Sequence, residues 1–552
     1  MASIGISMLC ACGGGGGGGS ASTPVADPTA SPDPPADTRV LTIVDAVPAA
    51  SAINANPAFG SLRVAHLGTA DLALTFSADC ENLSVNTFQQ SLFDLSNSAE
   101  EQLLDHRATC SLEPNSAYRL TAETHPNAEP IYTLEQAFST GPLDPPGLLI
   151  KDSVDLPRSE VNQLFQGYVQ GALPGQLDLP AGIENLVLNL LVDIADSNWN
   201  HLANPEALYD VRNLQVAYVS RTPDGSASNQ LTGLVSMPII ATASQFAPRD
   251  RIIVLTHATG STPSALSPAD AWYILASQFA SRGYLVIAPD NYGRGGTASA
   301  DETYLLDYQT AQNGFDLVSQ VLADPEYDAV NSGTDLTIIG YSQGGHSAIG
   351  LWKMLESQGS GDLAVREVYA GGAPHNLYRT FRGVLQYLDG SCAGDDYCRY
   401  VDRESTLPFA TDRILPGLLG YTETGLATDD LIDEGTIRPD FIAGFLSDEA
   451  TYDLLKVQLQ LNSFTGMIAG GNPLAGSVTG VHLYHSAFDR LVPDANTREL
   501  AAALEPLVTV DFDESRCNAD GYELLFNLTD KVGVLHTLCG LSVLDEVMSR
   551  LR

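Results

Sequence analysis

One stretch near the middle of the chain constrains the fold more than any other. Residues 336–339 (Leu-Thr-Ile-Ile) are apolar and rich in β-branched side chains, and the pattern Gly340-x-Ser342-x-Gly344 follows at once. Residues 347–355 then place apolar side chains at helical spacing. A turn this tight has no room for side chains two residues before and after its corner, which is where the two glycines lie. The sequence therefore predicts a strand that turns sharply into a helix, with Ser342 at the strained corner.

Strand and helix patterns alternate through the second half of the chain. We expect an initial β-hairpin around Pro223–Gly225, followed by near-continuous apolar strands, which indicate a mostly parallel sheet covered on both faces. Residues 149–204 are predicted to be mostly helical, with an apolar face from Ile183 to Ile194. The expected strands are 211–219, 231–238, 252–256, 284–288, 336–339, 367–370, 481–484 and 507–512, and the main helices are 271–281 and 304–322.

An all-β region is predicted to precede this part. Apolar and polar residues alternate at 72–76 and 118–122, with turn residues between such runs. The closing segment 137–141 resembles the final strand of bacterial Ig-like domains, and a length of about 100 residues suits a sandwich. We therefore expect a small Ig-like domain at 39–142, acting as a spacer or a weak binding module, and a Pro/Gly-rich hinge at 141–147.

The N-terminal residues indicate an exported and tethered protein. Residues 9–13 (Leu-Cys-Ala-Cys-Gly) resemble a bacterial lipobox, in which a cysteine, here Cys12, is lipidated and becomes the mature N-terminus. Residues 1–12 are interpreted as the remnant of a signal segment, and residues 13–38, rich in Gly, Pro and Ser, as a flexible linker. The expected membrane association is a lipid anchor. Because Gly13 gives no retention signal, we expect the outer membrane.

The charge balance excludes some partners. The chain has 552 residues, and 67 acidic against 27 basic residues give a net charge of −40. Such a surface repels nucleic acid and anionic headgroups, so no nucleic-acid partner is expected. The composition also suits a salty medium, in which screening relieves self-repulsion. The oligomeric state is not predicted.

The cysteines other than Cys10 and Cys12 fall into three pairs that are local in sequence. This arrangement suits disulfides in an oxidising compartment. No Cys-x-x-Cys or Cys/His cluster is present, so neither a metal site nor a cofactor is predicted. The expected pairs are Cys80 with Cys110, Cys392 with Cys398, and Cys517 with Cys539.

The serine corner and the alternating pattern together resemble a known family. Residues 205–552 are similar to α/β-hydrolase esterases, and most closely to bacterial lipoproteins related to secretory lipases. The resemblance rests on His257-x-Thr259-Gly260, on Gly340 to His346, and on Gly371-Gly372-Ala373-Pro374. It implies an α/β-hydrolase domain at 150–552, with residues 376–476 as a helical lid.

The resemblance also implies a catalytic triad in the chain order serine, acid, histidine. Ser342 would be the nucleophile. His536 is the one histidine placed after the last strand, where the fold puts its base. Asp489 starts a turn (Asp-x-x-Val-Pro) that resembles the acid-bearing turn of the family, while Asp513 is a rival and Asp494 fits better as a helix N-cap. The remaining histidines are interpreted as structural or out of order: His66, His106, His125, His201, His257, His346, His375, His482 and His485.

An oxyanion hole needs two backbone N–H donors. Gln343, directly after the serine, would supply one. The loop after strand 252–256 resembles the family's His-Gly-x turn, with Ala258 in place of the glycine, so Thr259 is the expected second donor and Ala258 the alternative.

The predicted function is a serine carboxylesterase or lipase that cleaves small-molecule or polymeric esters with hydrophobic acyl groups. Apolar lid segments at 414–419 and 441–446 either face the substrate or build the lid's own core. Two alternatives stay open. A lidded exopeptidase would need a lid carboxylate such as Glu404, Glu423 or Glu434 to bind the free amine, and a surface-binding lipoprotein would keep only the scaffold.

Overall fold

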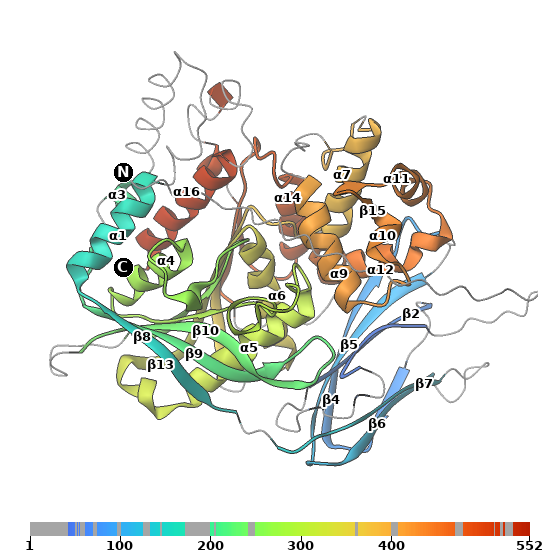
Figure 1. Cartoon of the computed structure of the whole chain (residues 1–552), viewed down its shortest axis with the longest axis horizontal. Coiled ribbons are helices and arrows are strands. Elements are labelled where there is room, and N and C mark those ends of the chain that lie inside the picture. The colour runs from blue at the N-terminus through green and yellow to red at the C-terminus, as the bar shows by residue number, and fades with distance from the viewer. Residues whose placement is uncertain are drawn as a thin grey trace, which may run out of the picture. The chain divides into compact units, whose positions relative to one another are not determined.

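A nine-stranded mixed sheet forms the centre of this computed structural model (Figure 1). The strand order is β18-β17-β14-β13-β11-β12-β10-β9-β8. Strands β18, β17, β14, β13, β11 and β12 run parallel to one another, whereas β10, β9 and β8 each pair antiparallel with the strand before them in this order. The strands are β8 Leu148–Leu156, β9 Val211–Arg221, β10 Ala227–Pro238, β11 Arg249–Thr256, β12 Leu285–Pro289, β13 Asn331–Tyr341, β14 Ala364–Gly371, β17 Gly480–Tyr484 and β18 Val510–Phe512.

The structure describes most of the chain between residues 42 and 551. The described residues are 42–49, 52, 55, 61–69, 74–96, 101–124, 133–143, 146–171, 199–203, 206–240, 249–358, 363–392, 394–398, 407–469, 478–512, 514–518, 523–524 and 534–551. The predicted lipidation site Cys12, the linker and the apolar face from Ile183 to Ile194 lie outside them.

Helices cover both faces of the sheet because successive strand residues point to opposite sides. Ile253 and Leu255 of β11 pack with α1, α3, α4 and α16, whereas Ile252 and Val254 pack with α5, α6 and α14. The predicted parallel sheet with two covered faces is confirmed. The helices are α1 Arg158–Gly171, α3 Asn200–Ala203, α4 Ala271–Ala280, α5 Asp307–Ala323, α6 Gln343–Gln358, α14 Ala495–Leu504 and α16 Val534–Arg550, with short turns η3 Pro263–Ala265, η4 Gly295–Thr297, η5 Pro325–Val330 and η8 Glu514–Cys517.

The prediction of a mostly helical segment from residue 149 was wrong at its start. Residues Leu148–Leu156 form β8, the edge strand next to β9. Leu149 and Ile150 are exposed at 58% and 43%, so the order of apolar and polar residues in β8 does not reflect burial. The strand is held by backbone pairing to β9, which an apolar periodicity cannot reveal. A helix, α1, begins only at Arg158.

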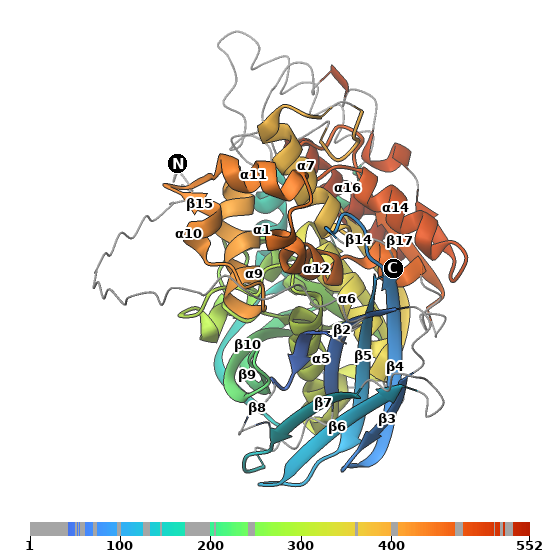
Figure 2. The same cartoon turned by 90° about the vertical axis from the view of Figure 1, so that its right-hand side faces the viewer.

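A helical insertion separates β14 from β17, as expected for the lid (Figure 2, orange). Its apolar segments mostly build the lid's own core: Ile414, Leu415, Leu418, Phe441 and Phe445 are buried together. The elements are α7 Leu377–Asp389, the π-helical turn η6 Ala410–Ile414, α9 Leu415–Tyr421, α10 Thr428–Leu431, β15 Ile432–Asp433, β16 Thr436–Ile437, α11 Pro439–Leu446, η7 Ala450–Tyr452, α12 Asp453–Leu461 and α13 Phe464–Ala469.

The N-terminal region forms two antiparallel sheets, of order β1-β2-β5-β4 and β3-β6-β7, as predicted for a small sandwich. Cys80 and Cys110 form a disulfide inside it. The strands are β1 Thr42–Val47, β2 Ser61–Thr69, β3 Leu74–Ala78, β4 Glu81–Ser91, β5 Glu101–Ser111, β6 Ala117–Thr124 and β7 Thr133–Ser139 (blue to teal in Figure 1).

The sandwich is not a free spacer. Residues Leu41–Arg552 form one compact unit, and apolar residues of β1, β2, β4 and β5 pack against Val457 and Leu461 of α12. The sequence prediction of a spacer was wrong because the contacting surface belongs to the lid, some 350 residues later in the chain.

Two buried histidines give the sandwich a testable pH dependence. His66 and His106 are 0% and 2% exposed, with 2.9 Å between their Nε2 atoms. His66 Nδ1 lies 3.0 Å from the Leu67 carbonyl oxygen, and this contact requires a proton on Nδ1. The neutral His66 ring therefore accepts a hydrogen bond at Nε2 from His106 Nε2. Protonation of His66 would place a second hydrogen between these two nitrogen atoms and break that hydrogen bond. Burial lowers the pKa of His66, and burial together with His66 lowers the pKa of His106 to about 3.

We expect the free energy of unfolding to fall as the pH drops from about 6.5 towards 3. Both folded pKa values lie below the unfolded value, so the unfolded chain binds more protons in this window, and each histidine contributes up to about 1.4 kcal/mol per pH unit. Urea unfolding at pH 7 and pH 4.5 measures this slope. H66Q/H106Q is expected to flatten it, whereas H201Q, outside the sandwich, leaves it unchanged. Equal slopes for the wild type and the double variant would contradict the prediction.

Within the described residues, no helix is both long and apolar enough to span a bilayer, and no group of His, Cys, Asp and Glu side chains is arranged to hold a metal ion.

Candidate active site

Ser342 lies at the corner between β13 and α6, as the sequence predicts. Its φ is +58°, a left-handed conformation that is strained for a residue with a side chain. The backbone N–H of Ser342 donates to the Gly371 carbonyl oxygen at the end of β14, 2.8 Å away. The strained residue is thus fixed by the neighbouring parallel strand.

The two glycines around Ser342 are sterically required. A Cβ on Gly340 would lie 2.1 Å from the Gly344 carbonyl oxygen. A Cβ on Gly344 would lie 2.0 Å from the carbonyl oxygen of Thr256, at the end of β11. Both contacts are with backbone atoms, which cannot move aside cheaply. The start of α6 therefore rests directly on the loop that follows β11.

His536 and Asp489 form a buried pair at the same edge of the sheet. His536 lies near the start of α16, and Asp489 lies in the turn after β17. His536 Nδ1 is 2.6 Å from Asp489 Oδ2, and the two residues are 8% and 0% exposed. The carboxylate accepts a hydrogen at Nδ1, so the neutral ring has an unprotonated Nε2. That atom is buried and has no hydrogen-bond partner within the described part of the chain.

Asp489 is held by its own turn. Its Oδ1 accepts from the backbone N–H groups of Leu491 and Val492 at 2.8 and 3.0 Å. Burial alone would raise the pKa of Asp489, but the His536 and His485 rings hold it well below its usual range. His485 Nε2 lies 3.4 Å from Asp489 Oδ2. This supporting role of His485 was missed, because its place on the acid-bearing strand gave no sign of the direction of its ring.

The imidazole of His536 lies beside the serine corner. The backbone around Ser342 is bonded to Gly371, and a Cβ on the next residue, Gly372, would lie 2.9 Å from His536 Cε1. Gly372 has a φ of +57°, so both its conformation and its surroundings require glycine. The hydroxyl of Tyr341 donates to the His536 carbonyl oxygen at 2.5 Å, and the two rings are 5.0 Å apart. Tyr341 and Gly372 position the histidine. Both belong to motifs that carry the family resemblance, but those motifs gave no sign of this role.

The predicted oxyanion loop begins directly after β11. His257 Nδ1 is 3.1 Å from the Ala258 carbonyl oxygen, and its Nε2 accepts from the Asn291 N–H at 3.2 Å. The ring therefore braces the loop. Thr259 contacts the Tyr304 hydroxyl through its own hydroxyl at 2.7 Å. The backbone N–H groups of Gln343, Thr259 and Ala258 stay the predicted donors.

The Gln343 side chain belongs to a polar network that the sequence did not reveal. Its Nε2 donates to Glu302 Oε1 at 2.6 Å. The other Glu302 oxygen lies 3.3 Å from Arg294 Nε and 3.5 Å from Arg413 Nη1 of the lid turn η6. Glu302 thus ties the serine corner to the lid.

Two further disulfides lie in the second part of the chain, one of them beside His536. Cys517 of η8 is joined to Cys539, which lies three residues after His536 in α16. Cys392 and Cys398 are joined within the lid. All three predicted cysteine pairs are joined in the structure.

The N-cap position predicted for Asp494 is confirmed, but the side chain does not make the capping contact. Asp494 stands at the N-cap position of α14, but its side chain makes no capping hydrogen bond and instead pairs with Arg498. Its backbone is helical, with a φ of −63°, rather than extended as a capping residue requires. The rival acid Asp513 lies outside the described residues.

The other histidines of this domain lie away from the reacting groups. His346 Nε2 contacts the Asn462 carbonyl oxygen at 2.9 Å, and His482 Nδ1 contacts Asp511 at 3.1 Å. His375 is fully buried after β14. His125 lies outside the described residues.

Residues 253–515 match the alpha/beta hydrolase family. The chain carries an α/β-hydrolase domain. No curated protein matches this sequence significantly. Among solved structures, the α/β-hydrolase domain is similar to the rice cell wall degrading esterase LipA from Xanthomonas oryzae, at 18% identity and a TM-score of 0.46 over 74% of this chain and 99% of that one. The acylaminoacyl peptidase from Pyrococcus horikoshii is similar at 12% identity and a TM-score of 0.28, over 54% of this chain and 43% of that one.

Proposed function

We propose that this protein hydrolyses carboxylic esters through Ser342, His536 and Asp489. The observation that carries the proposal is the 2.6 Å contact between His536 and Asp489, made beside a serine whose φ is +58°. In the neutral ring this contact places the hydrogen on Nδ1, and the free Nε2 of such a ring can take a proton from a serine hydroxyl.

The reaction follows from these positions. Ser342 Oγ attacks the ester carbonyl carbon while His536 Nε2 takes the hydroxyl proton. The imidazolium is stabilised by the Asp489 carboxylate, which stays ionised because its pKa is low. Backbone N–H groups of Gln343 and of Thr259 or Ala258 would hold the oxyanion. His536 returns the proton to the leaving alkoxide, and water then cleaves the acyl-enzyme by the same route.

Partly buried apolar side chains support a hydrophobic acyl group. Ala258, Tyr341 and Phe488 pack on the core next to the oxyanion loop, the serine and the acid, respectively. The apolar lid residues do not add to this argument, since most of them are used in the lid's own core. We therefore propose a carboxylesterase that acts on small-molecule or polymeric esters.

The exopeptidase alternative has less support. Glu423 and Glu434 are exposed, and Glu404 lies outside the described residues. Glu302, which contacts the serine corner through Gln343, is already compensated by Arg294 and Arg413. A carboxylate paired in this way is poorly suited to bind a substrate ammonium group.

A panel of p-nitrophenyl esters from acetate to palmitate, with aminoacyl anilides alongside, tests the proposal. We expect ester turnover in the wild type, loss of turnover in S342A, and labelling of Ser342 by a fluorophosphonate. Ser347 lies in α6, five residues after Ser342, and its hydroxyl donates to the Gln343 carbonyl oxygen at 3.2 Å, so S347A is the matched control. Turnover of anilides without esters would favour a peptidase. If the wild type is neither labelled nor able to turn over esters, the remaining alternative is a surface-binding lipoprotein that keeps only the scaffold.

The N-terminal lipobox resemblance supports a further part of the proposal, an exported protein anchored through Cys12 to the outer membrane. Mass spectrometry of the mature N-terminus tests it, and an unmodified Cys12 in membrane fractions would contradict it.

A further inference from the structure

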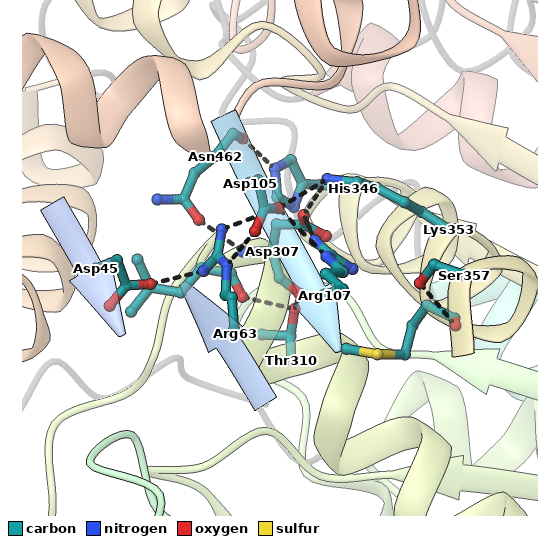
Figure 3. Close-up of polar contacts among 12 residues, drawn as sticks. Asp45, Arg63, Asp105, Arg107, Asp307, Thr310, His346, Lys353, Ser357 and Asn462 are labelled. Atoms are coloured by element: carbon teal, nitrogen blue, oxygen red, sulfur yellow. Dashed lines mark hydrogen bonds and ion pairs between the residues drawn. The ribbon is translucent and has the colours of Figure 1, made fainter. Parts of the chain in front are cut away.

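A cluster of buried charges joins the sandwich to the α/β-hydrolase domain (Figure 3). We call it the cross-domain cluster. Its members come from strands β1, β2 and β5 of the sandwich and from helices α5 and α6 of the hydrolase: Asp45, Arg63, Asp105, Arg107, Asp307 and Lys353.

Asp307, the first residue of α5, is the meeting point of the two domains. Its Oδ2 accepts from Arg107 Nη2 of the sandwich at 2.8 Å and from Lys353 Nζ of α6 at 2.9 Å. Arg107 also contacts Asp105 at 3.2 Å. On the sandwich side, Arg63 bridges Asp105 at 2.8 Å and Asp45 at 2.7 Å.

The cluster is balanced and almost completely buried. It holds three cations and three anions, and the side chains of Arg63, Asp105, Arg107, Asp307 and Lys353 are at most 3% exposed. Burial would raise the pKa of Asp307, but Lys353 and Arg107 hold it at about 2. Buried charges of this kind need all their partners, because removing one leaves another uncompensated in a medium of low dielectric constant. The sandwich therefore supplies charges that the hydrolase cannot replace.

The same helix that carries Lys353 begins at the serine corner. Gly350 allows α6 to approach α5, since a Cβ there would lie 2.6 Å from Asp307 Oδ1. The Asp307 N–H donates to Asn462 Oδ1 at 2.8 Å, and the Asn462 carbonyl oxygen contacts His346 Nε2 at 2.9 Å. His346 lies four residues after Ser342. The cluster thus contacts α6, the helix that begins at Ser342 and is called the nucleophile helix below. It also contacts Asn462, the residue directly after lid helix α12.

The lid contacts the sandwich directly as well. Gln458 Nε2 of α12 donates to the Val44 carbonyl oxygen at 2.6 Å, and Gln460 Nε2 donates to the Phe93 carbonyl oxygen at 3.0 Å. Tyr378 of α7 donates to Asp94 at 2.9 Å. These bonds surround the apolar contact between α12 and the sandwich strands.

We propose that the N-terminal sandwich is a positioning element of the active site. Through the cross-domain cluster it holds the nucleophile helix α6, and through α12 it holds the lid. The expected effect on kcat rests on the proposed ester hydrolysis. The expected effect on the rigidity of α6 and α12 does not, and amide hydrogen exchange measures it separately.

The test compares Arg107→Met with Arg119→Met in the full-length protein. Both arginines belong to the sandwich, but Arg119 forms an exposed pair with Glu135, with 58% and 47% exposure. We expect R107M to increase amide hydrogen exchange about tenfold or more in residues 343–358 and 453–461, and R119M to leave it within twofold. At a temperature where circular dichroism shows each variant folded, kcat for a short p-nitrophenyl ester should fall about tenfold in R107M with KM changed less than twofold. R107K, which keeps the charge, should recover most of the loss.

Gly350→Ala reaches the cluster from the hydrolase side without changing a charge, and it should raise exchange in α6 in the same way. If R107M does not fold, G350A carries the test, with R107K as the variant that should stay close to the wild type. A lowered melting temperature with unchanged exchange in α6 and unchanged kcat would overturn the proposal, since the cluster would then be only stabilising. Raised exchange in α6 in a protein that turns over no ester would instead overturn the proposed function and leave the positioning of α6 standing.

Discussion

Asp489→Asn is expected to lower kcat for p-nitrophenyl esters by about 10⁴-fold, a loss typical of serine hydrolases whose histidine is held in the wrong tautomer. The asparagine Oδ1 can still accept from Leu491 and Val492, so the turn should persist. Its amide group, however, would donate to His536 Nδ1, where the carboxylate now accepts. The proton would move to Nε2, and the ring could no longer take the proton of Ser342. Steady-state kinetics measures kcat, and KM should change less than about threefold because no substrate contact is lost.

Asp494→Asn is the matched control for this variant. Asp494 lies five residues further along the same segment and pairs with Arg498, away from His536. It should keep wild-type kcat within about twofold, as expected for a partly exposed ion pair. If D489N kept full activity, Asp489 would not be the acid of the triad, and Asp513 would have to be examined.

Gly344→Ala is expected to destabilise the protein by about 3 kcal/mol, the upper end of the usual cost of overpacking. The added Cβ would lie 2.0 Å from the Thr256 carbonyl oxygen and 2.9 Å from that of His257. Because both atoms belong to the backbone around the oxyanion loop, the clash must displace either that loop or α6. The rate of fluorophosphonate labelling at Ser342 should therefore fall roughly 100-fold, the effect of a displacement of about 1 Å.

Gly420→Ala provides the comparison, since a Cβ at Gly420 would meet nothing within 4 Å. Gly420 lies inside α9, where alanine is the better helix former, so this variant should gain about 0.5–1 kcal/mol. Urea unfolding measures both changes. A G344A protein with wild-type stability and labelling rate would show that the corner is less constrained than its geometry indicates.

Local patterns were sufficient to predict the sheet. The sheet strands β9 to β14, β17 and β18 lie where apolar runs indicate them, because strands buried on both faces have near-continuous apolar sequences. The edge strand β8 was missed because Leu149 and Ile150 are exposed and the strand is held by its pairing with β9. The chain order of Ser342, Asp489 and His536 was likewise available from motifs. The Glu302 network was not, since its members come from three separate segments: the stretch between β12 and α5, the start of α6, and the lid turn η6.

The sequence by itself determined the serine corner, since only glycine fits at 340 and 344 and this requirement is visible in the residue types. It also determined the parallel sheet and the three cysteine pairs. Only the tertiary structure decided which side chains meet across long separations: Arg107 with Asp307, Arg413 with Glu302, and the sandwich with lid helix α12. The physical reason is that backbone conformation and burial leave a periodic local signature. A charge pair leaves none, because any acidic residue can satisfy a buried arginine wherever the fold brings the two together.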